Sequence, residues 1–193
     1  MSTTRRRRAP EPTPGGAADR APDADPEAVA RGIVLRQLTM APRSRAQLAT
    51  ALADRGAADD VAQRVLDRFE QVGLIDDAEF AAAWVRSRHR TRGLSRRALA
   101  HELRAKGIDD ELAAQALTSL DEDDERRAAE QLVARRLRSM GELPREKQLS
   151  RLVGLLARKG YGGSLALQVV RAALDDQRDD DGGDGYADQG PLD

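Results

Sequence analysis

Two histidines, several pairs of adjacent carboxylates and one glycine-rich turn are the residues of this 193-residue chain that could do chemistry. His89 and His101 stand among basic residues, and neither belongs to a His-Glu-x-x-His motif or has a cysteine beside it. Such a pair makes a poor metal site. We therefore expect no metal ion, and we interpret both histidines as exposed residues on helix faces.

The carboxylate pairs stand where helices are expected to begin, at Asp59-Asp60, Asp76-Asp77 and Asp109-Asp110. Acidic groups are favourable there because they face the positive end of the helix dipole, so capping explains them better than acid–base catalysis. The turn at 160–163 precedes a helix whose N-terminus could hold an anion. No P-loop accompanies it, and the chain has no cysteine. We expect no catalytic residues and no cofactor.

Basic residues form a more specific pattern, because they gather in two clusters. Residues 86–106 hold eight basic residues against one acidic residue, and residues 135–159 hold eight against two. Residues 43–77 hold five basic and seven acidic residues. Solvated helix faces are the alternative explanation, but two matching clusters favour a surface that attracts a polyanion or an acidic protein groove. The candidate binding residues are Arg86, Arg88, Arg90, Arg92, Arg96, Arg97, Lys106, Arg135, Arg136, Arg138, Arg151, Arg158 and Lys159.

Aromatic residues are too few to form a stacking platform for bases, since the chain has one Trp, two Tyr and two Phe. Phe80 and Trp84 lie four residues apart, on one face of an expected helix, and core packing explains them best. Any nucleic-acid contact is therefore expected to be with phosphates and to lack sequence specificity.

A nine-residue phrase that occurs three times shows how these residues are positioned. It occupies residues 48–56, 99–107 and 152–160, and each copy has Leu eight and four residues before a final Gly, with Arg or Lys directly before that Gly. The glycines are 51 and 53 residues apart. A period of about fifty residues indicates tandem structural units rather than one enzyme core.

Apolar residues recur at helical spacing through the repeated region, which predicts three helices in each unit. The expected helices are 27–39, 44–55, 58–73, 77–90, 95–106, 109–120, 123–140, 145–159 and 163–174. The fold class is therefore all-α, with three tandem three-helix repeats forming an elongated, curved array. We place the units at 27–76, 77–121 and 122–175, between an N-terminal tail at 1–26 and an acidic C-terminal tail at 176–193, both expected to be disordered.

No apolar run is long enough to cross a membrane, and no signal peptide follows the N-terminal arginines. These features predict a cytoplasmic protein without a membrane contact.

Three stretches of the chain resemble the RecX family of bacterial recombination regulators. They are Leu35-Arg-Gln-Leu38 with Pro42-Arg-Ser-Arg-Ala-Gln-Leu48, then Val72-Gly-Leu-Ile-Asp-Asp-Ala-Glu-Phe-Ala81 running into 84–88, and Leu103-Arg-Ala-Lys-Gly-Ile-Asp109. The resemblance spans about residues 28–174, and the third repeat is the most degenerate.

The resemblance implies a protein that binds the RecA recombinase and its filament on DNA. Such regulators lie in the filament groove and limit filament extension, ATPase, strand-exchange and coprotease activities in DNA repair, recombination and the SOS response. They are not enzymes, so the resemblance transfers no catalytic residue. We expect a monomer that acts on RecA and the RecA–DNA filament, with non-specific contact to DNA phosphates.

A helix-turn-helix transcription regulator is the alternative function, because Ser44-Arg-Ala-Gln-Leu48 opens a short helix as such motifs do. Regulators of that kind usually dimerise on half-sites, whereas these repeats lie within one chain and no dimer helix is evident. A phosphate-processing enzyme is disfavoured because the sequence lacks a catalytic constellation.

Overall fold

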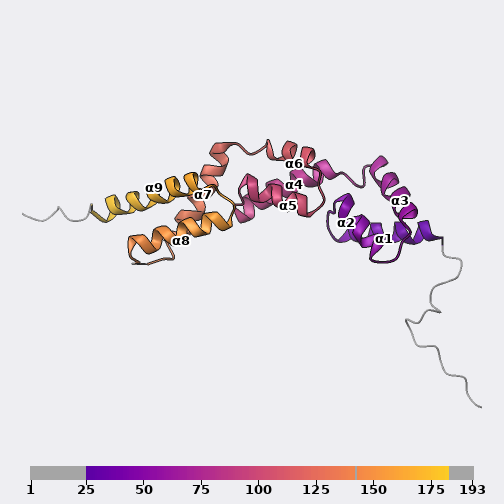
Figure 1. Ribbon diagram of the computed structural model, residues 1–193, viewed down its shortest axis with the longest axis horizontal. Coiled ribbons are helices and arrows are strands. Elements are labelled where there is room, and N and C mark those ends of the chain that lie inside the picture. The colour runs from indigo at the N-terminus through magenta and orange to yellow at the C-terminus, as the bar shows by residue number, and fades with distance from the viewer. Residues whose placement is uncertain (1–24, 142, 183–193) are drawn as a thin grey trace, which may run out of the picture.

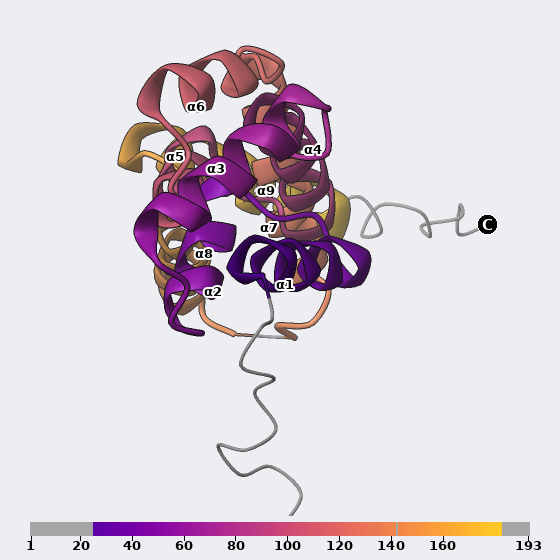
Figure 2. The ribbon, with the colours of Figure 1, turned by 90° about the vertical axis from the view of Figure 1, so that its right-hand side faces the viewer.

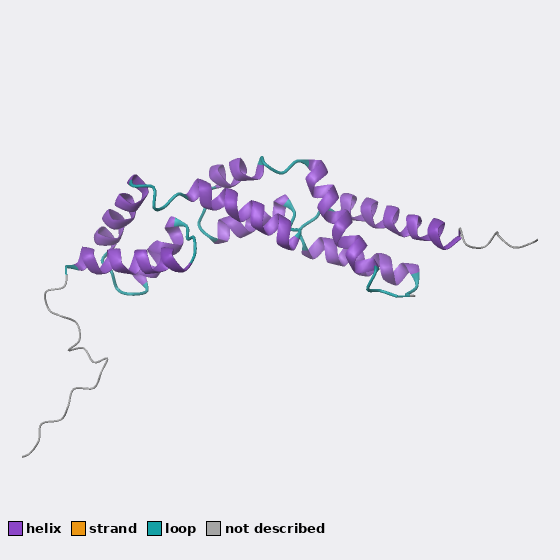
Figure 3. Cartoon of the chain, turned by 180° about the vertical axis from the view of Figure 1, so that it is seen from behind, coloured by secondary structure: helices purple, strands orange, loops and turns teal. Residues whose placement is uncertain are grey.

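The computed structural model describes residues 25–141 and 143–182, and these residues form helices but no strand (Figure 3). The helices are α1 (Pro26–Met40), α2 (Arg45–Ala53), α3 (Asp59–Gln71), α4 (Asp77–Arg92), α5 (Arg96–Ala105), α6 (Asp110–Leu117), α7 (Glu122–Leu137), α8 (Arg145–Arg158) and α9 (Gly163–Gly182). They follow one another in three groups of three along an elongated, curved body (Figure 1). We call these groups unit one, unit two and unit three. The all-α prediction is confirmed.

Each unit has its own hydrophobic core, and the repeated leucines form its centre. The two leucines of each phrase, at 48 and 52, 99 and 103, and 152 and 156, are at most 1% exposed. The three cores draw their residues from 30–75, 80–120 and 129–174 respectively. Figure 1 shows the three units in succession, and in the view along the long axis they lie one behind another (Figure 2). The units therefore meet end to end rather than wrapping around a common core.

Helix starts follow the local sequence as expected. Ser44 and Ser95 cap α2 and α5 by accepting backbone hydrogen bonds from Gln47 and Ala98. Among the carboxylate pairs, Asp76 and Asp109 cap α4 and α6 in the same way. The first pair differs, because α3 starts at Asp59 without a side-chain cap.

The glycine of each phrase ends the second helix of its unit in a left-handed conformation. Gly56, Gly107 and Gly160 have φ of +74°, +74° and +91°. This conformation is readily available only to glycine. In units two and three the same glycine has a second function, because the start of the preceding unit's second helix packs directly against it.

The junction between units one and two consists of two hydrogen bonds beside Gly107. The Ser44 hydroxyl donates to the carbonyl oxygen of Lys106 at 2.6 Å, and the backbone N–H of Arg45 donates to the carboxylate of Asp77 at 2.8 Å. A Cβ placed on Gly107 would overlap Ala46. The glycine therefore allows unit one to approach unit two closely.

The junction between units two and three repeats this arrangement around Gly160. The backbone N–H of Ser95 donates to the carbonyl oxygen of Lys159 at 3.1 Å, and that of Arg96 donates to the Glu125 carboxylate at 2.8 Å. A Cβ on Gly160 would lie 2.5 Å from the Ser95 hydroxyl and 2.7 Å from Ala98 Cβ. Around Gly56, which receives no preceding unit, nothing lies within 4 Å of an added Cβ.

The ends of the array differ from the predicted tails. Pro26, assigned to the N-terminal tail, is the first residue of α1, and Asp25 caps that helix. At the other end α9 continues to Gly182, so residues 176–182 are helical rather than disordered. The Arg145 guanidinium binds the carbonyl oxygen of Leu174 and the carboxylate of Asp175, which holds α9 as it leaves the core, and a formed helix extends at little cost. The rest of both predicted tails lies outside the described residues.

Candidate partner-binding clefts

The basic residues singled out from the sequence lie on the first two helices of units two and three, or at the ends of those helices. Within the described residues, some of them line three clefts, others have side-chain partners within the chain, Arg92 does both, and Arg96 and Arg138 do neither. The clefts are the α4–α7 cleft and the α5–α8 groove, both at the junction of units two and three, and the α7–α8 groove within unit three.

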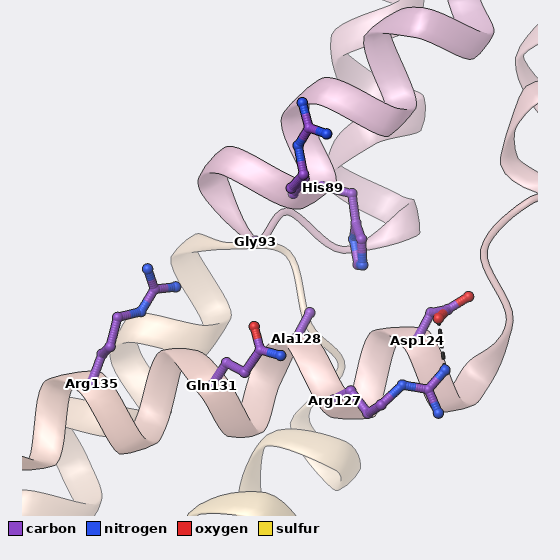
Figure 4. Close-up of a pocket in the computed structure, with 8 residues that line it drawn as sticks. His89, Gly93, Asp124, Arg127, Ala128, Gln131 and Arg135 are labelled. Carbon is purple, nitrogen blue, oxygen red and sulfur yellow. Dashed lines mark hydrogen bonds and ion pairs between the residues drawn. The ribbon is translucent and has the colours of Figure 1, made fainter.

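The α4–α7 cleft lies between units two and three and has a volume of about 240 Å³. Figure 4 shows Arg127, Ala128, Gln131 and Arg135 along α7, with His89 of α4 facing them. The other lining residues are Arg90, Gly93 and Asp124. The cleft thus brings two predicted residues, Arg90 and Arg135, together from different units.

Gly93 forms a fixed wall of this cleft. It ends α4 with φ of +56°, and an added Cβ would lie 2.9 Å from the Leu132 side chain. The buried Tyr161 hydroxyl donates to the Gly93 carbonyl oxygen at 3.1 Å, and burial followed by the charge of Glu125 raises the pKa of Tyr161 to about 12. Contacts from unit three therefore hold the end of α4 in place, and this fixes one wall of the cleft.

Asp124 reduces the positive charge of the cleft at one end only. It accepts a hydrogen bond from Arg127 at 2.7 Å, and this bond, together with the backbone N–H of Asp121, is the main cause that lowers the pKa of Asp124. Within the described residues Arg90 and Arg135 form no ion pair, and both are exposed. The cleft therefore retains net positive charge for an anionic partner.

The α5–α8 groove, of about 550 Å³, crosses the same junction. Its predicted residues are Arg92, Arg97 and Arg158, beside His101 and Arg104. Glu102 also lines the groove and pairs with Arg92 at 3.5 Å. The α7–α8 groove, of about 450 Å³, lies within unit three, and its predicted residues are Arg136, Arg151 and Arg158. Since Arg158 lines both grooves, they adjoin and form one extended basic surface.

Several other predicted residues have partners within the chain. Arg86 pairs with Glu79 at 3.0 Å, and the Lys159 ammonium donates to the Arg92 carbonyl oxygen at 2.8 Å. Arg88 and Lys106 lie over the Trp84 ring, 4.1 and 3.9 Å from its centroid.

Lys106 is partly withdrawn from solvent at this position. Burial and then the nearby charge of Arg88 lower its pKa, although Glu102 opposes that effect. Phe80 stacks on Trp84 with ring centroids 5.8 Å apart, which agrees with the packing function expected for both rings. Lys106 and Lys159 thus make contacts within the array. Of the remaining predicted residues, Arg96 is partly buried, and Arg138 is exposed outside the three clefts.

Sequence reasoning missed four polar or charged residues that line the α4–α7 cleft: His89, Asp124, Arg127 and Gln131. The expectation that His89 is simply exposed is wrong, because it is half-buried and its Nδ1 lies 3.0 Å from the carbonyl oxygen of Leu94. Arg127 was overlooked because it follows the acidic first turn of α7. The spacing of four between Arg127, Gln131 and Arg135 places all three on one helix face and is the signal that could have identified them.

Within the described residues, no group of histidine and carboxylate side chains is placed to hold a metal ion. None of the helices in that part of the chain is long and apolar enough to cross a membrane.

An array of tandem three-helix units, each with its own core, defines a helical-repeat protein. Family models agree with the repeat. The model described as the first three-helix domain of RecX matches residues 30–69, and that for the second three-helix domain matches residues 76–117.

Comparison with known proteins gives the family directly. The chain is 53% identical over 159 residues to a protein of Streptomyces coelicolor named Regulatory protein RecX, covering 82% of this chain and 85% of that one. It is 51% identical over 162 residues to the protein of the same name from Thermobifida fusca, covering 84% and 86%. The chain belongs to the RecX family.

The fold agrees with a crystal structure of RecX from Lactobacillus salivarius. The two structures match with a TM-score of 0.69 over 77% of this chain and 97% of that chain, at 19% sequence identity. A second crystal structure, of a regulatory protein RecX, matches with a TM-score of 0.68 over 76% of this chain and 73% of that one.

Proposed function

We propose that this protein is a regulator that binds the RecA recombinase and its filament on DNA. It limits filament extension and thereby lowers the ATPase, strand-exchange and coprotease activities of RecA. It acts as a monomer and is not an enzyme. The observation that carries this proposal is membership of the RecX family, joined to the gathering of predicted basic residues in clefts at the unit two–unit three junction.

The clefts support contact with an acidic protein surface or with DNA phosphates. Arg90 and Arg135 line one cleft, and Arg97 and Arg158 line the α5–α8 groove. Guanidinium groups bind carboxylates and phosphates in two-point geometry. We therefore narrow the candidate surface to the cleft-lining residues Arg90, Arg92, Arg97, Arg135, Arg136, Arg151 and Arg158.

The array also supports a mechanism. Three linked units can touch successive protomers of one filament, so that weak contacts combine through their effective concentration. A regulator bound in this way bridges neighbouring protomers and opposes the rearrangements that growth and the ATP cycle require.

The test is a RecA ATPase assay on single-stranded DNA with the full chain titrated at substoichiometric ratios. We expect inhibition by the natural chain and its loss when Arg90, Arg97, Arg135 and Arg158 are replaced by Glu. The matched control replaces four exposed arginines outside the clefts, Arg36, Arg55, Arg64 and Arg171, by Glu. Inhibition that survives the cleft variant would remove the assignment of these residues. No inhibition by the natural chain would remove the proposed function itself.

The helix-turn-helix alternative is disfavoured by the position of the helix starts. A reading helix inserts its N-terminal residues into the major groove. Here the starts of α2 and α5 pack on the next unit, and Ser44 and Ser95 are at most 1% exposed. A sharp sequence-specific footprint on duplex DNA would nevertheless favour that alternative.

A further inference from the structure

Unit one has an exposed apolar surface that the basic clefts do not explain. Six large apolar side chains of the described residues are at least 36% exposed, and five of them belong to unit one. They are Val29, Leu35, Met40, Val72 and Leu74, and the sixth is Leu167 of α9. Isolated exposed apolar residues are ordinary, but a cluster of them marks an interaction site.

Three of the five line a groove between α1 and α3, with a volume of about 520 Å³. We call it the unit-one groove. Leu35, Val72 and Leu74 are 46%, 51% and 52% exposed along its edges, and the buried side chains of Val65 and Phe69 form its floor. The groove thus offers a continuous apolar lining that reaches from solvent to the core of unit one.

The corresponding surface of unit two is different. The core residues Ala30 and Val34 of α1 match Ala81 and Val85 of α4, at a distance of 51 residues and with the same complete burial. At that register Leu35 corresponds to Arg86, an exposed charged residue. In addition α3 has 13 residues and α6 has 8, so unit one has an extra turn, which carries Arg68 and Phe69. The groove of unit one therefore has no equivalent among the described residues at the matching surface of unit two.

The charges on the rim indicate what the groove can accept. Its charged lining residues are Arg31, Arg68 and Glu27. Arg31 pairs with Glu27 at 3.3 Å, but both side chains are about half exposed, and such a pair contributes little stability and can exchange partners. Two arginines beside an apolar lining complement a ligand whose apolar side chains are flanked by carboxylates.

We propose that the unit-one groove binds an amphipathic helix of a partner protein, with apolar side chains on Leu35, Val72 and Leu74 and flanking carboxylates on Arg31 and Arg68. Helices dock into apolar grooves of this kind through side chains at i, i+3, i+4 and i+7. The inference rests on the proposed function, since RecA is the protein component of the filament and is the probe to use. The groove would then add a largely salt-insensitive contact to the salt-sensitive contacts of the clefts.

The experiment compares two double variants of the full chain in binding to RecA filaments on single-stranded DNA. Leu35→Ser with Leu74→Ser removes two groove anchors. Val29→Ser with Leu167→Ser removes two apolar side chains outside the groove that are 50% and 36% exposed. At 0.5 M salt, where the basic clefts are screened, we expect the groove variant to bind roughly tenfold more weakly than the natural chain, as loss of an apolar anchor does. The control variant should bind as the natural chain does.

A third variant keeps the apolar lining and tests the charges. Arg31→Glu with Arg68→Glu should weaken binding at low salt and leave the thermal unfolding of the chain unchanged. Equal binding by the groove and control variants would overturn the groove assignment, and unchanged or tighter binding by the rim variant would overturn the acidic flank. Failure of the natural chain to bind RecA filaments would instead remove the proposed function and this inference together.

Discussion

Unit one and unit two have the same three-helix scaffold but present opposite kinds of surface. Their repeated leucines are equally buried and their glycines adopt the same φ of +74°. Outside the core, unit one has an apolar groove between its first and third helices, whereas unit two has arginines on its first and second helices. The two units therefore share the residues that form the core and the junction with the next unit. The residues between the core positions differ, and they give each unit a different surface.

Salt dependence should separate the two surfaces most clearly. Replacing Arg90, Arg97, Arg135 and Arg158 by Gln should lower the slope of log affinity against log salt for filament binding by about 3, because each phosphate contact contributes roughly 0.7–0.9 to that slope. The groove variant Leu35→Ser with Leu74→Ser should keep the slope of the natural chain. Titrations between 0.05 and about 0.2 M salt, the range over which such contacts change affinity strongly, measure both. Equal slopes for the two variants would contradict the assignment of a charged surface to the clefts and an apolar surface to the unit-one groove.

The repeated glycine offers a second contrast, between Gly160 and Gly56. Alanine at either position must adopt a left-handed conformation, at a cost of about 1–2 kcal/mol. Only at Gly160 does the added Cβ also meet Ser95 and Ala98, and overpacking of this kind costs roughly 1–3 kcal/mol more. Denaturant unfolding should therefore show Gly160→Ala to be more destabilising than Gly56→Ala by that difference. Equal losses of unfolding free energy for the two variants would mean that the junction around Gly160 accommodates the added methyl group without strain.

Tyr161 distinguishes the second junction from the first, where Ile108 takes the equivalent place after the glycine. Tyr161→Phe removes the hydrogen bond to the Gly93 carbonyl oxygen and should cost about 1 kcal/mol at neutral pH. Since folding raises the pKa of Tyr161 from 10 to about 12, its contribution is complete below pH 10 and is lost as the pH rises towards 12. The free energy of unfolding of the natural chain should thus fall more steeply over this range than that of the variant. A parallel fall would refute the assignment.

Much of the fold could be predicted because the same sequence pattern occurs three times. A leucine pair followed by a glycine fixes a buried helix face and its end, and three copies give the unit length. The second function of the glycine could not be predicted, since the phrase contains no signal for which unit packs on Gly107 or Gly160. That depends on how neighbouring units pack, through contacts between residues far apart in the sequence.

The candidate surface was predictable in outline but not in detail. Charge counting finds clusters, and it found Arg90 and Arg135, but it cannot tell an arginine facing a cleft from Arg86, which pairs with Glu79. Charge counting also overlooked Arg127, because the acidic residues beside it in the sequence cancel its charge in the sum. The unit-one groove was missed for another reason. Leu35 looks like a core residue in a helical pattern, Leu74 lies in the loop after α3, and only the packing leaves both half exposed.

The Trp84 cluster gives this array a built-in spectroscopic sensor. Trp84 is the single tryptophan of the chain, and its ring lies against Lys106, whose backbone carbonyl accepts the hydrogen bond from Ser44 of unit one. Separation of unit one from unit two would break the hydrogen bond to the carbonyl of Lys106, the same residue whose ammonium lies over the indole ring. The emission of the unlabelled chain can therefore be used to monitor the junction between unit one and unit two.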